Sequence, residues 1–288
     1  MLLNAINLSY FEPWLKFKTP IVRQLAFVVA SPNILAQIPN DLAIQYSFQL
    51  HPDHFWQQHY LQYETRLEQL DRDPTELLHF IAQLKSTRLG LRFEYLMWFW
   101  LKDHRFHAFK LLGHSIQMFQ GQRTLGEIDF LILNENTQQI EHWEVALKYY
   151  LAEADFQLQH WYGLNRQDTL LRKLKHFTEK QFQFTAVQSH EIQKRFSVLK
   201  GQLYYPTHYF PYKTETWIND MRRIGHWGRT IPQQKYYALT RHEWICPNIT
   251  QSTNNAIWWT NGLYKHQDQQ DFYMYRQPHI LNIHVQKV

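Results

Sequence analysis

The residues best suited to chemistry lie in one short segment, 124–148, which holds two acids and a lysine in an apolar setting. Asp129 is followed directly by Phe-Leu-Ile-Leu, and Glu144 is enclosed by Trp, Val, Ala and Leu. Apolar runs of this kind mark strands that are covered on both faces. Alternate residues of a strand share a face, so Glu144 and Lys148 should point the same way. We therefore expect two carboxylates to converge, with an amine nearby.

Two carboxylates that face one point repel each other unless a cation lies between them. Mg²⁺ or Mn²⁺ takes oxygen ligands of this kind, and a lysine can then orient a water or stabilise charge on a phosphate. The segment predicts a metal-dependent site with Asp129, Glu144 and Lys148 as its catalytic residues. The alternative is a surface hairpin with solvated charges, which suits Glu135 and Glu141 better than the two enclosed acids.

The elements before this segment are expected to be helical. A helix with Pro20 in its first turn should end at Ser31-Pro32, and further helices are expected over 51–73 and 74–86. The stretch 89–101 is apolar nearly all round and predicts a buried helix with one conspicuous charge, Glu94. A buried charge is costly unless it is paired or ligates a metal.

Strands are expected over 107–120, 124–133 and 139–151, with a turn at 134–137. A helix capped by Asp168 should follow over 168–182, and then a strand over 201–206. Beyond Lys235, three short aromatic strands are expected in 236–245, 256–262 and 271–277. The chain is predicted to be one compact α/β unit, with a helical region 1–85, a core 86–235 and a β-rich extension 236–288.

Gly-Glu-Ile-Asp, a short hairpin and then Glu-x-x-x-Lys resemble the core of the PD-(D/E)XK nuclease superfamily. The resemblance implies a restriction-endonuclease-like core, which runs helix, three-stranded meander, helix, strand. It also implies that Glu94, Asp129 and Glu144 hold the metal.

The basic residue of that superfamily usually follows the third-strand acid by two positions, but here that place is Ala146. Lys148 lies two residues further on, about 7 Å along the same face. Lys173 or Lys175, on the next helix, could reach the site instead.

Longer motifs, spread over nearly the whole chain, resemble the bacterial domain-of-unknown-function family 1853. They are Thr19-Pro-Ile-Val-Arg-Gln-Leu-Ala-Phe, Ser31-Pro32, Gly90-x-x-x-Glu94, His142-Trp-Glu-Val-Ala-Leu-Lys148, Gly163-Leu-Asn-Arg-Gln-Asp168 with Leu170 and Lys173, and Arg241-His-Glu-Trp-Ile-Cys-Pro247. That family has been grouped with the PD-(D/E)XK folds and has no settled function to carry over.

Charge is distributed unevenly along the chain. The net charge is +5, yet residues 1–85 hold six Lys or Arg against eight Asp or Glu, and residues 160–229 hold twelve against five. A polyanion would therefore be held by the middle of the chain, unless these are simply solubilising surface charges. The nucleic-acid-binding candidates are Arg166, Arg172, Arg222, Arg223 and Arg229, and the secondary site candidates are Glu127, His142, Lys173, Lys175 and Gln181.

Composition excludes several other classes. A single cysteine, Cys246, permits neither an internal disulfide nor a cysteine zinc cluster, so His142-Trp-Glu144 is no zinc-deaminase motif. No Walker loop or dinucleotide fingerprint is present. The longest apolar stretch, 95–101, is too short for a membrane span, and a cytoplasmic protein is expected. An aromatic content of 16% fits core packing, or a groove in which bases stack.

The sequence thus predicts a Mg²⁺- or Mn²⁺-dependent nuclease, with DNA a better candidate substrate than RNA. Two alternatives remain open. One is a nuclease-like fold that no longer cuts and binds nucleic acid or a protein, which the displaced lysine favours. The other is an interaction protein with no nucleic-acid role.

Overall fold

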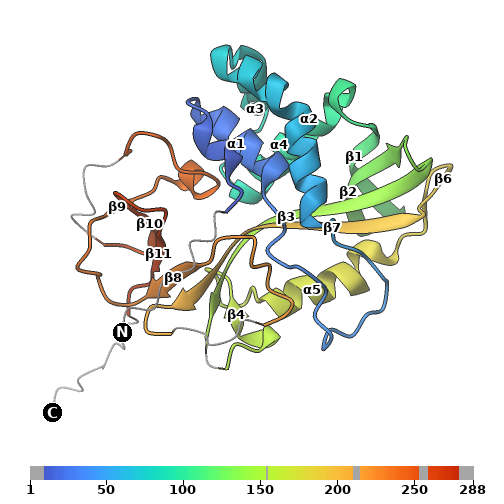
Figure 1. The fold of residues 1–288 in the computed structure, drawn as a ribbon. Coiled ribbons are helices and arrows are strands. Elements are labelled where there is room, and N and C mark those ends of the chain that lie inside the picture. Colours follow the sequence, from blue (N-terminus) through green and yellow to red (C-terminus); the bar gives the residue numbers. More distant parts are fainter. Residues whose placement is uncertain (1–9, 154, 210–214, 253–258, 279–288) are drawn as a thin grey trace.

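The computed structural model describes residues 10–153, 155–209, 215–252 and 259–278. Within these ranges the chain folds into a mixed α/β structure built on one large sheet with helices packed against it (Figure 1).

Four α-helices precede the sheet, where the apolar periodicity predicts them. They are α1 (Pro20–Ala30), α2 (Asp53–Arg72), α3 (Thr75–Ala82) and α4 (Leu89–Lys102), with the short 3-10 helices η1 (Pro13–Lys16) before and η2 (His104–Phe106) after them. Pro20 begins α1, because the first residues of a helix donate no helical hydrogen bond and proline, which has no N–H, loses none there. The extended backbone of Ser31 ends the helix. None of the helices in the described ranges is long and apolar enough to cross a bilayer.

The sheet begins with an antiparallel meander of β1 (Phe109–Gln120), β2 (Arg123–Asn134) and β3 (Gln139–Ala152). It continues through β7 (Lys194–Pro206), β8 (Gly225–Gly228), β11 (Phe272–Tyr275), β10 (Gly262–His266) and β9 (Tyr236–Ala238). The pairs β3–β7, β7–β8 and β8–β11 are parallel. Strand β10 is antiparallel to both of its neighbours, β11 and β9. The two-residue strand β4 (Trp161–Tyr162) pairs with the end of β3.

Helix α5 (Leu170–Glu179) lies in the connection from β3 to β7. The short helices η3 (Leu158–His160) and η4 (Gln181–Gln183) flank it, and a small hairpin of β5 (Ala186–Val187) and β6 (His190–Glu191) follows. Figure 1 shows α1 to α4 on one face of the sheet and α5 on the other.

The structure differs from the sequence prediction at several ends. Thr169, and not Asp168, caps α5, because its side chain accepts a hydrogen bond from the backbone N–H of Arg172. Strand β7 starts seven residues before the expected 201–206, at Lys194, since it pairs with β3 continuously from Lys194 to Tyr204. Of the expected strand 236–245 only the first residues are extended, and Arg241–Trp244 forms the 3-10 helix η5. In the expected strand 256–262, residues 256–258 lie outside the described ranges.

Strand β3 is buried on both faces, and its alternate residues enter two different cores. Trp143, Val145, Leu147, Tyr149 and Leu151 join the larger core with α1, α2 and α4. Ala146, Tyr150 and Ala152 join the smaller core with Leu170, Leu174 and Phe177 of α5. The period of two therefore directs the even-numbered residues, which include Glu144 and Lys148, towards the side of α5.

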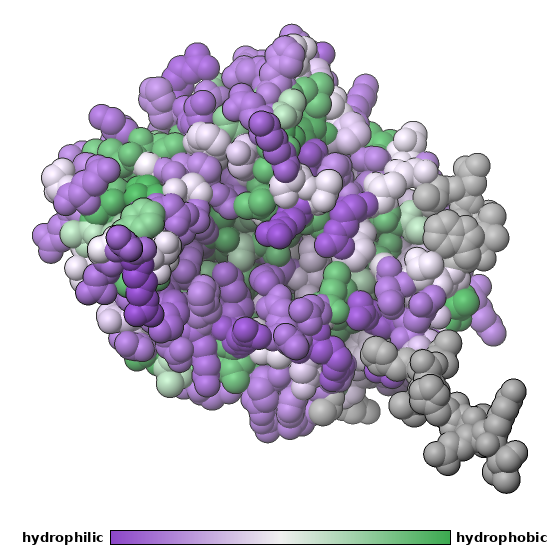
Figure 2. All heavy atoms as spheres, turned by 180° about the vertical axis from the view of Figure 1, so that it is seen from behind, coloured by the Kyte–Doolittle hydropathy of each residue, from purple (hydrophilic) through white to green (hydrophobic). Residues whose placement is uncertain are grey.

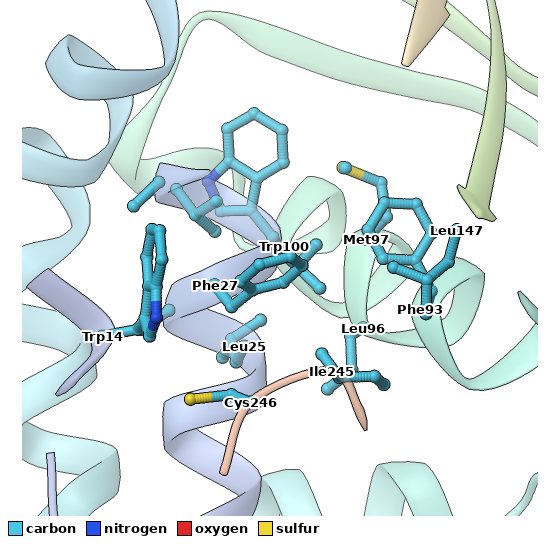
Figure 3. Close-up of a cluster of buried hydrophobic side chains, with 14 of the residues drawn as sticks. Trp14, Leu25, Phe27, Phe93, Leu96, Met97, Trp100, Leu147, Ile245 and Cys246 are labelled. Carbon is cyan, nitrogen blue, oxygen red and sulfur yellow. The ribbon is translucent and has the colours of Figure 1, made fainter. Parts of the chain in front are cut away.

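The larger core also receives the C-terminal part of the chain. Ile245 and Cys246 lie among residues of α1 and α4, beside Trp14, Leu25 and Leu96 (Figure 3). The face opposite to that of Figure 1 is mostly hydrophilic, and its apolar residues appear as scattered patches (Figure 2).

Gly201 is a position where β7 and β3 approach closely. Its φ is +130°, and a Cβ there would lie 1.8 Å from the carbonyl oxygen of Lys148. We expect Gly201→Ala to lower the free energy of unfolding by at least about 2 kcal/mol, because both the backbone conformation and the contact exclude a methyl group. Chemical denaturation measures the change.

Gly90 provides the matched control. It lies in α4, and a Cβ added to it would have nothing within 4 Å, so Gly90→Ala should raise stability by about 0.5–1 kcal/mol. Equal effects of the two substitutions would contradict the close approach at Gly201.

Lys200 is a fully buried lysine of the sheet. Its Nζ donates to the carbonyl oxygen of Val28 and lies 3.4 Å from the ring centroid of Trp56. Burial lowers the pKa of Lys200 well below its usual range. The folded protein therefore holds the amine neutral where the unfolded chain, with a lysine pKa of about 10.4, still binds a proton.

The free energy of unfolding should accordingly rise with pH from the lowered pKa up to about 10.4. Lys200→Met removes this dependence, so its stability relative to wild type should be highest near neutral pH and fall towards pH 10. Urea denaturation across this range tests it, with the exposed Lys85→Met as control. A stability difference that stays constant from pH 7 to 10 would contradict the lowered pKa of Lys200.

Candidate active site

The site forms where β2 diverges from β3. Pairing of the two strands runs from Asn134↔Gln139 as far as Phe130↔Trp143 and stops there. At the next position the Oδ2 of Asp129 accepts a hydrogen bond of 2.8 Å from the backbone N–H of Val145. The Asp129 side chain thus replaces the strand bond that would otherwise be lost.

Glu144 lies opposite Asp129 at this divergence. Its Oε1 accepts a bond of 3.4 Å from the backbone N–H of Asp129, so the structure brings the two acids together. Glu144 is only 1% exposed. Gln181 of η4 donates from Nε2 to Glu144 Oε2 at 2.5 Å, which ties the acid to the end of α5.

His142 supports the other oxygen of Glu144. The distance between His142 Nε2 and Glu144 Oε1 is 2.6 Å, and both side chains are buried. Burial, with a smaller effect of the Arg195 charge, lowers the pKa of His142 to about 3. The imidazole is therefore neutral and shares a hydrogen bond with Glu144 through Nε2, and its Nδ1 has no hydrogen-bond partner among the described residues.

Burial also changes the acids. It raises the pKa of Glu144 to about 7, against the opposing effect of the Gln181 hydrogen bond. Burial and the charges of Glu144 and Glu94 raise the pKa of Asp129 well above its usual range. The charge of Glu94 also raises the pKa of Glu144, so both paired acids respond to it.

Glu94 reaches this cluster from α4 on the opposite face of the sheet. Its Oε1 lies 2.8 Å from Nε2 of His114, a β1 residue whose ring stacks on Trp98 at 4.2 Å. No sequence pattern marked His114, because its role depends on how β1 packs against α4. The secondary candidate Glu127 lies on β2, and its carboxylate is bound by the neighbouring edge strand β1, from which Ser115 and Gln117 donate to it.

The two lysines have different partners. Lys148 Nζ lies 2.5 Å from Asp168 Oδ2, in the loop before α5, and Tyr150 donates to the other oxygen of Asp168 at 3.4 Å. Lys173 of α5 is half-buried, and its charge lowers the pKa values of both Glu144 and Asp129. Of the two lysines, Lys173 is therefore the one whose charge favours ionisation of the paired acids. Lys148 instead pairs with Asp168.

A basic groove follows α5 beside this cluster. It is a cavity of about 790 Å³. Asp168 and Lys173 lie in its wall together with the basic side chains Arg172, Lys175, His176 and Lys180. Lys175 is exposed, and Arg172 is exposed with one bond, to the carbonyl oxygen of Gln167 at 3.0 Å. Backbone phosphates could lie along such a groove.

The other arginines proposed for nucleic-acid binding lie elsewhere. Arg166 forms a two-bond pair with Glu153, and Arg229 is exposed. Arg222 and Arg223 require a correction. Arg222 is buried, donates to the carbonyl oxygen of Gly201 at 2.9 Å and pairs with Glu12.

Arg223 also pairs with Glu12, at 2.8 Å, and stacks on Tyr10. These two guanidiniums hold the chain around η1 against β7, and Arg222 has no free surface to offer a phosphate. The sequence interpretation missed this because Glu12 lies about two hundred residues away.

The donor set of the cluster suits a hard cation, since Glu94, Asp129 and Glu144 supply only carboxylate oxygens. Their mutual repulsion is the kind that such a cation relieves. Within the described ranges, however, no three His, Cys, Asp or Glu side chains are gathered closely enough to hold an ion. The bonds of Glu144 to His142 and Gln181, and of Glu94 to His114, occupy oxygens that an ion would use.

Fold and site together define a mixed α/β protein with a buried acidic cluster beside a basic helix. The family model described as Domain of unknown function (DUF1853) matches residues 23–283, and the chain belongs to that family. No curated protein and no solved structure matches it. The family description names no activity, so function must be argued from the site.

Proposed function

We propose that this protein is a metal-dependent nuclease that hydrolyses phosphodiester bonds in DNA. The observation that carries the proposal is the pairing of the half-buried Asp129 with the buried Glu144 at the divergence of β2 from β3. Burial raises the pKa of both acids, and the charge of Glu144 raises that of Asp129 further, a perturbation that is typical of catalytic groups.

The order of elements supports a restriction-endonuclease-like core. Helix α4, the meander β1 to β3, helix α5 and strand β7 follow one another along the chain, and β7 is parallel to β3. Glu94 on the leading helix, Asp129 on the second strand and Glu144 on the third then occupy the acidic positions of the PD-(D/E)XK superfamily.

Glu94, Asp129 and Glu144 would hold Mg²⁺ or Mn²⁺. Such an ion supplies a water of lowered pKa and stabilises charge on the phosphate. Lys173 offers a positive charge to the phosphate that is attacked, and Gln181 fixes the carboxylate of Glu144 in place. The basic side chains of α5 would bind the backbone on either side.

The acids can be tested with isosteric changes. We expect Asp129→Asn and Glu144→Gln each to lower cleavage of single- or double-stranded DNA by about 100-fold or more, because each removes a charge that acts on the transition state. Purified protein is assayed on DNA and RNA with Mg²⁺, Mn²⁺ or EDTA. Glu135→Gln, in the exposed turn after β2, is the control and should cleave normally. Cleavage that survives in both site variants would refute the assignment.

The lysines can be separated by a second set of variants. Lys173→Met should reduce kcat by about 10-fold or more, since its charge lowers the pKa of both paired acids. The substitution also removes the cation–π contact of its Nζ with Phe177, so the folded stability of the variant is measured alongside. Lys175→Met, two residues on and exposed, should weaken DNA binding only at low salt. Lys148→Met should reduce activity less than Lys173→Met. The reverse order would identify Lys148 as the catalytic lysine.

A second candidate function is a nuclease-like module that binds nucleic acid or a protein without cutting. It is favoured by the closed hydrogen bonding of Glu144 and by the pairing of Lys148 with Asp168. Calorimetry with Mn²⁺ distinguishes the two. Binding that is lost in Asp129→Asn supports the nuclease, and no binding at all supports the module.

A further inference from the structure

A second basic cavity lies beyond the far end of β3, outside the acidic cluster. Its volume is about 310 Å³, within the range for small-ligand sites. Three arginines line it, Arg166, Arg229 and Arg276, against one acid, Glu153. The lining therefore carries a net charge of about +2, as three guanidiniums less one carboxylate.

The sheet itself places two of these arginines side by side. Gly228 of β8 and Tyr275 of β11 are the last pair of a parallel ladder, and the backbone N–H of Arg276 donates to Gly228 at 2.9 Å. Arg229 and Arg276 follow directly, on chains about 4.8 Å apart. Like charges in neighbouring positions destabilise a sheet, so the arrangement calls for an anion.

The three guanidiniums are satisfied to different degrees. Arg166 is paired with Glu153 at 2.5 and 2.9 Å, and Arg276 donates from Nη2 to the carbonyl oxygen of Leu164 at 3.0 Å. Arg229 makes no hydrogen bond or ion pair with the described part of the chain. Burial and the charges of Arg166 and Arg229 lower the pKa of Arg276. Several N–H groups thus remain available to an incoming oxyanion.

Aromatic rings complete the cavity. Trp227 is half-buried, and its Nε1 donates to the carbonyl oxygen of Ala152 at 2.9 Å, which fixes the plane of the indole. Tyr162 is covered by the guanidinium of Arg166 at 4.3 Å. A fixed indole beside a guanidinium with free N–H groups, here that of Arg229, is a combination that can hold a nucleobase next to its phosphate.

We propose that this cavity binds a phosphate monoester attached to a nucleoside, as found at the end of a nucleic-acid strand, with the adjoining base against Trp227. Charge distinguishes a terminal from an internal phosphate. A monoester carries about −1.5 to −2 at pH 7, which matches the lining, whereas each phosphate within a strand carries one charge. That the nucleotide belongs to a strand rests on the proposed function.

The loop 163–168 connects this cavity with the acidic cluster. Gly163 lines the cavity, and its backbone N–H donates at 2.6 Å to the carbonyl oxygen of Asp168, which also holds Lys148. From Glu144 to Leu151, at the cavity, the chain runs seven residues along β3, or about 23 Å. That distance corresponds to about seven phosphates of one strand at 3.4 Å each. A strand end held here would keep a fixed spacing from the cleavage site.

The test measures binding without cleavage. Three fluorescent DNA oligonucleotides of one sequence, with a 5′-phosphate, a 3′-phosphate or hydroxyl ends only, are titrated with the full chain in EDTA. We expect one phosphorylated form to bind about tenfold more tightly than the hydroxyl form, as for a hydrogen-bonded charge pair. Arg229→Gln should abolish this preference, and the exposed Arg123→Gln, at the β1–β2 turn, should keep it.

Glu153→Gln provides a gain of binding that misfolding cannot imitate. It removes the one acid of the cavity and frees Arg166, so the preference for the phosphorylated end should increase severalfold. Competition by a nucleoside monophosphate identifies the source of the ligand. Displacement at micromolar concentration assigns the site to free nucleotides, and its failure assigns it to strand ends.

Equal affinity for all three oligonucleotides, or a preference that persists in Arg229→Gln, would overturn the proposal. Its failure is distinguishable from that of the nuclease. Cleavage of closed circular DNA with Mg²⁺ requires no strand end, so it reports on the acidic cluster alone. End preference without Mg²⁺-dependent cleavage of either circular or linear DNA would leave the cavity standing and remove the nuclease.

Discussion

The divergence of β2 from β3 is the constraint on which the site depends. Two paired strands have no room for side chains between them, so a pocket at the sheet requires that the pairing stop. It stops beyond Phe130↔Trp143, and the carboxylate of Asp129 then bonds the N–H of Val145 that the ladder leaves open. The same residue thus preserves the backbone hydrogen bonding and turns its carboxylate towards Glu144. Removing its charge without changing its shape separates these two roles.

Much of this arrangement could be predicted from local patterns. Helical periodicity gives α1 to α4, and alternation in β3 correctly separates Glu144 and Lys148 from Trp143 and Leu147. These signals act over a few residues, which is why they survive in a single sequence. Burial of Glu144 followed from the apolar residues around it, whereas Asp129 is only half-buried. Family membership, too, followed from motifs spread along the chain.

What could not be predicted depends on distant partners. Lys148 was expected to serve the acids, but the loop 163–168 folds back and brings Asp168 to its amine. Arg222 resembled a phosphate ligand in sequence, yet Glu12 and the carbonyl oxygen of Gly201 hold it in the interior. A charge pattern reports the number of basic residues in a segment. It does not report which of them find an acid elsewhere in the fold.

The electrostatics of β3 unify the acidic cluster and the arginine cavity. The strand has buried carboxylates at one end and borders uncompensated guanidiniums at the other, with α5 and its basic groove between. Each end alone is unfavourable, because like charges are held close together, at the acids within the protein and at the arginines nearer to solvent. A polyanion that brings its own divalent cations would neutralise both at once, the cations at the acids and the phosphates at the arginines. Stability gained in this way would be linked to binding, so the charge repulsion in the free protein and the proposed affinity for such a ligand would have one physical origin.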